Sequence, residues 1–153
     1  MYIVICYLII ILMILLGAAM SFAQGLLPEW LQRYSLLYMC ALAGGFGGIT
    51  YCLRGVYLNA CVFKRWDDVW RPWYFIRPIV SVLCGAVSYV FLQAGLLVLE
   101  VSQKSDSTHL GFVALAFIAG LNVDKFIAKI EDIAQATWGI EKSRTASKEE
   151  ENV

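Results

Sequence analysis

The chain of 153 residues is 60% hydrophobic and only 16% charged, a composition far from that of an ordinary soluble domain. Its 12 Lys and Arg residues balance 12 Asp and Glu residues. Overall basicity therefore gives no reason to expect direct nucleic-acid binding, which needs a concentrated positive surface. We expect an all-α, polytopic membrane protein with four transmembrane helices.

The first apolar run covers residues 2–23 and contains no charged side chain. At about 1.5 Å per residue it would extend about 33 Å, enough to cross a hydrocarbon core of about 30 Å. A cleavable signal peptide is the alternative, because Ser21-Phe22-Ala23 resembles a small-x-small cleavage site. No Lys or Arg precedes the run, so we expect this helix to be retained.

The second and third apolar runs, residues 35–53 and 78–99, are both long enough to span a bilayer. Arg54 follows the second run and Arg77 precedes the third. Pro78 suits a first helical position, because its missing N–H would have no partner there. Aromatic residues near the start of the third run predict an interfacial belt: Trp66, Trp70, Trp73 and Tyr74.

The fourth apolar run, residues 109–123, is short, because Asp124 and Lys125 follow it after only about 22 Å. Apolar residues spaced three or four apart continue through residues 123–138 and predict an amphipathic helix. We predict one long helix, or a helix bent near Gly120, that emerges into the cytoplasm.

Lys and Arg are concentrated in two segments: Arg54, Lys64, Arg65, Arg71 and Arg77 between the second and third runs, and Lys125, Lys129, Lys142, Arg144 and Lys148 after the fourth. With four crossings, the positive-inside rule and the alternation of loops agree on placing both segments in the cytoplasm. We predict a bacterial inner-membrane protein with both termini cytoplasmic. Residues 1–140 form its transmembrane domain, with the amphipathic extension at 123–138, and the polar residues 141–153 form a disordered tail.

Small residues gather on the second and third predicted helices: Gly44, Gly45 and Gly48 on one, and Ser81, Gly85 and Ser88 on the other. Gly44 and Gly48 form a G-x-x-x-G step, which lets helix backbones approach closely in lipid. Two interpretations stay open: a packing seam within or between subunits, or a flexible, pore-lining point where glycines permit a bend. The two stripes predict tight helix contacts and a homo-oligomer.

The sequence contains no motif for catalysis, cofactor binding or metal binding. His109 is the single histidine and falls on a predicted external loop, and the five cysteines include no C-x-x-C pair. The first three runs carry no charge away from their ends, whereas small four-helix multidrug exporters need an embedded carboxylate. We expect neither an enzyme nor a cofactor.

Two cytoplasmic surfaces are candidates for binding a protein partner. The loop at residues 64–71 combines charges with Trp66 and Trp70, which suits either a headgroup-level anchor or a docking surface. The polar face of the helix at 123–138 carries both signs, which weakens attraction to anionic lipid and favours protein contact. Its predicted partner-binding residues are Phe126, Ile127, Ile130 and Ile133.

The stretch FIAGLNVDKF at residues 117–126, followed by Thr137-Trp138-Gly139-Ile140, is similar to small membrane proteins of bacterial anti-phage systems. Retron-associated membrane effectors are the group it resembles most. The likeness covers about the last third of the chain and the four-helix layout, and its motif has no catalytic residue. It implies an effector that a partner holds inactive, often a reverse transcriptase with its RNA–DNA product, and that damages the inner membrane on release.

We therefore predict a non-enzymatic inner-membrane effector in antiviral defence. It would oligomerise and permeabilise or depolarise the membrane under the control of a cytoplasmic partner. Two alternatives stay open: a membrane anchor or assembly subunit that recruits a cytoplasmic complex, and a small ion channel or transporter subunit.

Overall fold

The computed structural model describes residues 1–26, 28–64, 66–95 and 105–140, and the regular structure within these ranges is entirely helical. The α-helices are α1 (Tyr2–Ala23), α2 (Glu29–Gln32), α3 (Ser35–Tyr57), α4 (Arg71–Gln93), α5 (Ser105–Leu121) and α6 (Val123–Trp138). A π-helical segment, η1 (Leu58–Val62), prolongs α3, and a short 3-10 helix, η2 (Asp68–Trp70), leads into α4.

Three helical segments are long and apolar enough to cross a membrane: Tyr2–Ala23, Ser35–Val62 and Arg71–Gln93. Large apolar side chains of α1 are exposed along its whole length, as expected of a helix that faces lipid. α5 and α6 are long and apolar enough to cross a membrane only when they are taken together as one segment. They are bent by 110° at the break between them. The structure is therefore compatible with a multi-pass membrane protein that has three spanning helices, or four if the bent pair counts as one span.

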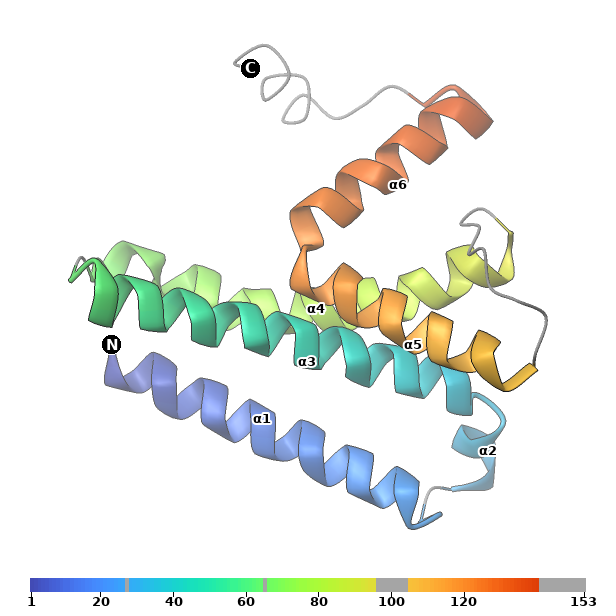
Figure 1. Ribbon diagram of the computed structural model, residues 1–153, viewed down its shortest axis with the longest axis horizontal. Helices are drawn as coiled ribbons and strands as arrows, with labels where there is room; N and C mark the ends of the chain where they lie inside the picture. Colours follow the sequence, from blue (N-terminus) through green and yellow to red (C-terminus); the bar gives the residue numbers. More distant parts are fainter. Residues whose placement is uncertain (27, 65, 96–104, 141–153) are drawn as a thin grey trace.

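α3 lies at the centre of the bundle, packed along α4 and α5 and also against α1 (Figure 1). The N-terminus and the segment 58–70 lie at one end of the bundle, while α2 and the start of α5 lie at the other end (Figure 1). The predicted topology places segment 58–70 and the other loops on opposite sides of a bilayer, and it stays a prediction, because the second basic segment lies on α6, which leaves from the middle of the bundle (Figure 1).

The second predicted helix is longer than the sequence indicated, and the third begins and ends earlier. Helical structure after Ser35 continues through Val62, well past residue 53. α4 runs from Arg71 to Gln93, whereas the predicted run was 78–99, of which residues 96–99 lie outside the described residues. The expectation that Pro78 opens its helix is wrong, because Pro72 lies in the first turn and Pro78 lies inside α4. The helix can begin earlier because Arg77 is buried against other side chains and is not left facing lipid.

The fourth apolar run and the amphipathic segment after it form two helices, α5 and α6, not one long helix, and they are bent by 110° close to Gly120, as the second alternative held. Asn122 lies between them with φ −122° and ψ 55°, outside the helical region. Its N–H donates to the Ile118 carbonyl and its own carbonyl accepts from the Phe126 N–H, both at 2.9 Å, so one residue ends α5 and begins α6. The expectation that His109 lies on an external loop is wrong, because α5 begins at Ser105 and includes His109.

α6 ends at Gly139, whose φ of 68° is a left-handed conformation that glycine adopts readily. The tail predicted to be disordered, residues 141–153, lies outside the described residues.

Glycines let α3, α4 and α5 approach one another backbone to backbone. A Cβ added at Gly44 would lie 2.7 Å from the Gly85 Cα on α4 and would collide with the Ser81 carbonyl oxygen. A Cβ added at Gly120 on α5 would collide with the Gly44 carbonyl oxygen. Any larger residue at these positions would force the helices apart, and lipid cannot replace the lost packing.

Candidate functional site

A buried arginine lies in α4 at the point where α5 meets α6. Arg77 is 5% exposed, and its Nη1 donates to the Asp124 carboxylate at 2.7 Å. Its Cζ lies 4.7 Å from the ring centroid of Tyr51 and 5.1 Å from that of Trp73, so two aromatic faces stabilise the cation. Among the described residues its Nε has no hydrogen-bond partner. Charge within a spanning helix is costly, which makes Arg77 a candidate for a functional role.

Asp124 is the partner that connects this arginine to the last helix. It lies in the first turn of α6, where a carboxylate also interacts favourably with the helix dipole, and its side chain is 80% exposed. The pair joins residues 47 positions apart in the chain. The ion pair therefore holds the first turn of α6, called here the root of α6, against the middle of the bundle.

Ser81 forms a second polar contact at the same corner. It is fully buried, and its hydroxyl lies 2.9 Å from the Arg77 carbonyl oxygen and 3.0 Å from the Gly120 carbonyl oxygen. A hydroxyl has one proton to donate, so the bond can be made within α4 or across to α5. A Cβ added at Gly48 would collide with the Ser81 side chain, which shows how closely α3 covers this hydroxyl.

The other predicted seam residues lie on different faces within the same chain. Gly45 faces α1 and α4, since an added Cβ would lie 2.8 Å from Leu15 Cδ1 and 2.9 Å from Val82 Cγ2. Ser88 is fully buried and donates to the Gly85 carbonyl oxygen at 2.7 Å. The small residues thus pack helices of one chain together, and the predicted homo-oligomer stays a prediction.

The predicted partner-binding face of α6 is only partly covered by the chain itself. Phe126, Ile130 and Ile133 are half-buried, and Ile127 is 41% exposed. Figure 1 shows α6 leaving from the middle of the bundle and pointing away from it. The helix therefore presents much of its surface outside the packed core.

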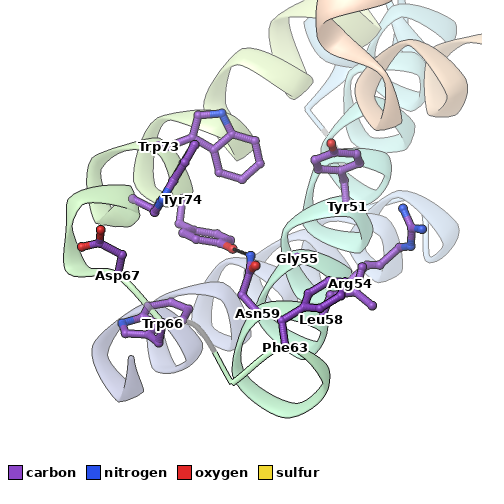
Figure 2. Close-up of a pocket in the computed structure, with 11 residues that line it drawn as sticks. Tyr51, Arg54, Gly55, Leu58, Asn59, Phe63, Trp66, Asp67, Trp73 and Tyr74 are labelled. Carbon is purple, nitrogen blue, oxygen red and sulfur yellow. Dashed lines mark hydrogen bonds between the residues drawn. The ribbon is translucent and has the colours of Figure 1, made fainter.

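The remaining predicted partner-binding residues, Trp66 and Trp70, line a cavity of about 560 Å³ (Figure 2). Its walls come from the end of α3, from η1, from the segment that leads into α4 and from the first turn of α4. Its aromatic members are Tyr51, Phe63, Trp66, Trp70, Trp73 and Tyr74. The Trp66 and Tyr74 rings are stacked with centroids 5.7 Å apart, and Trp73 meets Tyr74 edge to face at 5.0 Å. Asn59 Nδ2 donates to the Tyr74 hydroxyl at 3.4 Å.

The two predicted partner surfaces do not form one site. The cavity lies at the end of the bundle near segment 58–70, whereas α6 rises from its middle (Figure 1). Tyr51 and Trp73 lie between them, because their rings contact Arg77 and also line the cavity.

Several residues of this arrangement were missed by reasoning from sequence. Arg77 was assigned to a loop because Pro78 suggested a helix start, although an arginine with rings at suitable positions in neighbouring helices can be buried. Gly47 was not singled out, yet a Cβ there would lie 2.8 Å from the Leu121 N and would collide with the Phe117 carbonyl oxygen. The three-residue spacing of Gly44 and Gly47 could have indicated a second close-packed face on α3.

Comparison with known proteins gives no family model, curated protein or solved structure that matches this chain.

Proposed function

We propose that this chain is a non-enzymatic membrane docking subunit, in which a helical bundle holds α6 at the cytoplasmic membrane surface to bind a protein partner. The observation that carries the proposal is the corner between α5 and α6, with its 110° bend at Asn122. Arg77, Asp124 and Ser81 brace this corner with buried or partly buried polar contacts. Such bracing gives α6 a defined direction, which a loosely attached tail would not need.

The fourth crossing is part of this proposal. α5 has 17 residues and extends about 25 Å, somewhat less than the hydrocarbon thickness of about 30 Å. It ends level with Arg77, next to the rings of Tyr51 and Trp73. Tyr and Trp gather at membrane interfaces, so we place this level at the inner edge of the headgroup region. The segment Ser35–Val62 extends about 42 Å, so its last part would then lie beyond the hydrocarbon core. After a bend of 110°, α6 would then run roughly along the membrane surface.

The proposed topology places segment 58–70 in the cytoplasm. We expect Lys64→Cys, in a chain whose native cysteines are replaced, to react with a membrane-impermeant maleimide only after the cells are opened. Lys64 is exposed between η1 and η2, so the thiol would be accessible once the reagent reaches the cytoplasmic side of the membrane. Rapid labelling in intact cells would show that the orientation is inverted.

Charge on α6 favours a protein partner over an anionic lipid surface. The helix carries two lysines, Lys125 and Lys129, against three acidic residues, Asp124, Glu131 and Asp132. Helices that bind anionic membranes by themselves are typically rich in Lys and Arg on the polar face. A mixed polar face beside a row of isoleucines instead suits a groove on another protein, where the apolar anchors are buried and charges lie at the rim.

The test of this proposal is Ile130→Asp combined with Ile133→Asp in the full-length chain. We expect the variant to insert into the membrane normally but to lose the proteins that co-purify with the wild type, because two carboxylates cannot be buried in an apolar groove. The matched control is Ala128→Asp with Gln135→Asp, which adds the same charge at two exposed positions on the opposite face. The control should keep every partner. If the isoleucine variant also keeps them, α6 is a surface-lying helix and the docking proposal fails.

The permeabilising effector, controlled by a reverse transcriptase with its RNA–DNA product, stays a prediction. In the described residues the glycine faces of α3 contact α4 and α5, so a pore would need several copies or a rearrangement. A potential-sensitive dye in the same cells measures this activity. Depolarisation that depends on Ile130 and Ile133 would favour a partner-controlled effector, and an unchanged potential in all strains would favour docking alone.

A further inference from the structure

We propose that the aromatic cavity at the end of α3 and α4 binds the headgroup of a zwitterionic phospholipid. Its volume of about 560 Å³ falls within the range of about 300–1,000 Å³ found for small-molecule sites. The cavity lies beside the connection between two helices that are each long enough to span a membrane. If both cross, their connection lies at the level of lipid headgroups.

One side of the cavity suits an ammonium group. Trp66 and Trp73 each contact Tyr74 there, and the faces of such rings attract cations. Asp67 adds a negative charge, and Figure 2 shows it on the same side of the cavity as Trp66 and Trp73. One Asp67 oxygen accepts the Val69 N–H at 3.0 Å, and a carboxylate has acceptor capacity beyond a single bond.

The other side of the cavity suits a phosphate group. Arg54, from the last turn of α3, also lines the cavity, on its α3 side. Figure 2 shows its guanidinium directed outward from α3 and away from Asp67, so it would meet a phosphate at the outer edge of the cavity. A guanidinium offers several N–H donors in a geometry that matches phosphate oxygens. Ammonium and phosphate are the two charged groups of a zwitterionic headgroup, so its charges and those of the cavity are complementary. An anionic headgroup without an ammonium group, such as that of phosphatidylglycerol, offers the rings no cation and is repelled by the Asp67 carboxylate.

The test uses the full-length protein in a maltoside detergent, titrated with dihexanoyl phosphatidylcholine below its critical micelle concentration. Trp66, Trp70 and Trp73 are three of the five tryptophans, so intrinsic fluorescence reports on the cavity. We expect saturable binding that is weakened about 10-fold by Asp67→Asn and by Trp66→Ala. Asp67 is exposed, so its variant is not expected to impair folding. Trp138→Ala, at the far end of α6, should leave the affinity unchanged.

Three outcomes would overturn this inference. Equally tight binding of dihexanoyl phosphatidylglycerol would show that the ammonium is not recognised. Equally tight binding of glycerophosphocholine, which has no acyl chains, would identify a site for a soluble compound and not for a lipid. Unchanged affinity in both Asp67→Asn and Arg54→Gln would place the lipid elsewhere. None of these results bears on α6, so the docking proposal is tested separately.

Discussion

Adding a single methyl group, as Gly44→Ala or Gly120→Ala, is expected to lower the stability of the bundle sharply. The new Cβ at either position meets backbone atoms of a neighbouring helix, and backbone cannot rotate away as a side chain can. Overpacking commonly costs about 1–3 kcal/mol, and we expect values at or above the top of that range. The measurement is unfolding of the detergent-solubilised protein by increasing mole fraction of sodium dodecyl sulfate, followed by circular dichroism.

Two other glycines provide matched controls. A Cβ at Gly45 meets only the ends of the Leu15 and Val82 side chains, which can move, so Gly45→Ala should cost less. A Cβ at Gly17 meets no atom within 4 Å, and Gly17→Ala should be neutral or stabilising by up to about 1 kcal/mol through helix propensity. Equal stability of all four variants would contradict the close backbone contacts.

The same variants also test the predicted homo-oligomer. In the structure, Gly44 and Gly48 contact α4 of their own chain, so substitution should disturb the protomer itself. If native gels show that Gly44→Leu and Gly48→Leu release folded protomers of unchanged stability, the glycines lie between subunits, as one of the two sequence interpretations held.

Removing the charge of Asp124 is expected to loosen the root of α6. Asp124→Asn replaces the carboxylate beside the buried Arg77 guanidinium with a neutral amide oxygen, so the aromatic faces must stabilise more of its charge. A hydrogen bond to a charged group contributes about 1.5–3 kcal/mol, and we expect the lower part of this range because the Asp124 side chain is 80% exposed. Distances between spin labels on α3 and near the end of α6 should broaden, while α6 stays helical.

A double-mutant cycle with Arg77→Met separates the ion pair from other effects. Arg77→Met removes both the ion pair and the ring contacts, so it should loosen α6 without leaving a buried charge. Adding Asp124→Asn to Arg77→Met should then have almost no further effect. Lys125→Gln, at the next and exposed position, is the charge-removal control. If Asp124→Asn loosens α6 equally with and without Arg77, the pair does not hold the corner.

Much of the architecture was predictable from apolar run length. The span of α1 coincides with residues 2–23 because a helix facing lipid needs no partner to define its ends. The amphipathic helix at 123–138 was also predicted with the bounds that the structure shows, since its apolar positions recur at helical spacing. Neither prediction depends on which residues lie beside the helix.

The features missed all depend on neighbours. Arg77 was assigned to a loop because a charge ordinarily ends a span, and only the rings of Tyr51 and Trp73 together with Asp124 allow it inside one. The glycine stripe was recognised from the sequence. Its spacing does not show whether the helices that pack against it belong to a second subunit or are α4 and α5 of the same chain.

The sequence by itself thus determined a helical chain with helices apolar enough to cross a membrane, the bounds of the first of them and the amphipathic final helix, because apolar length and helical periodicity are properties of one segment at a time. The tertiary structure alone decided the direction of α6 and the gathering of Trp66, Trp73 and Tyr74 around a cavity. The bend at Asn122 is held by contacts to Arg77 and Ser81, some 40 residues earlier in the chain. A direction set by such distant contacts leaves no periodic signal in the segment that turns.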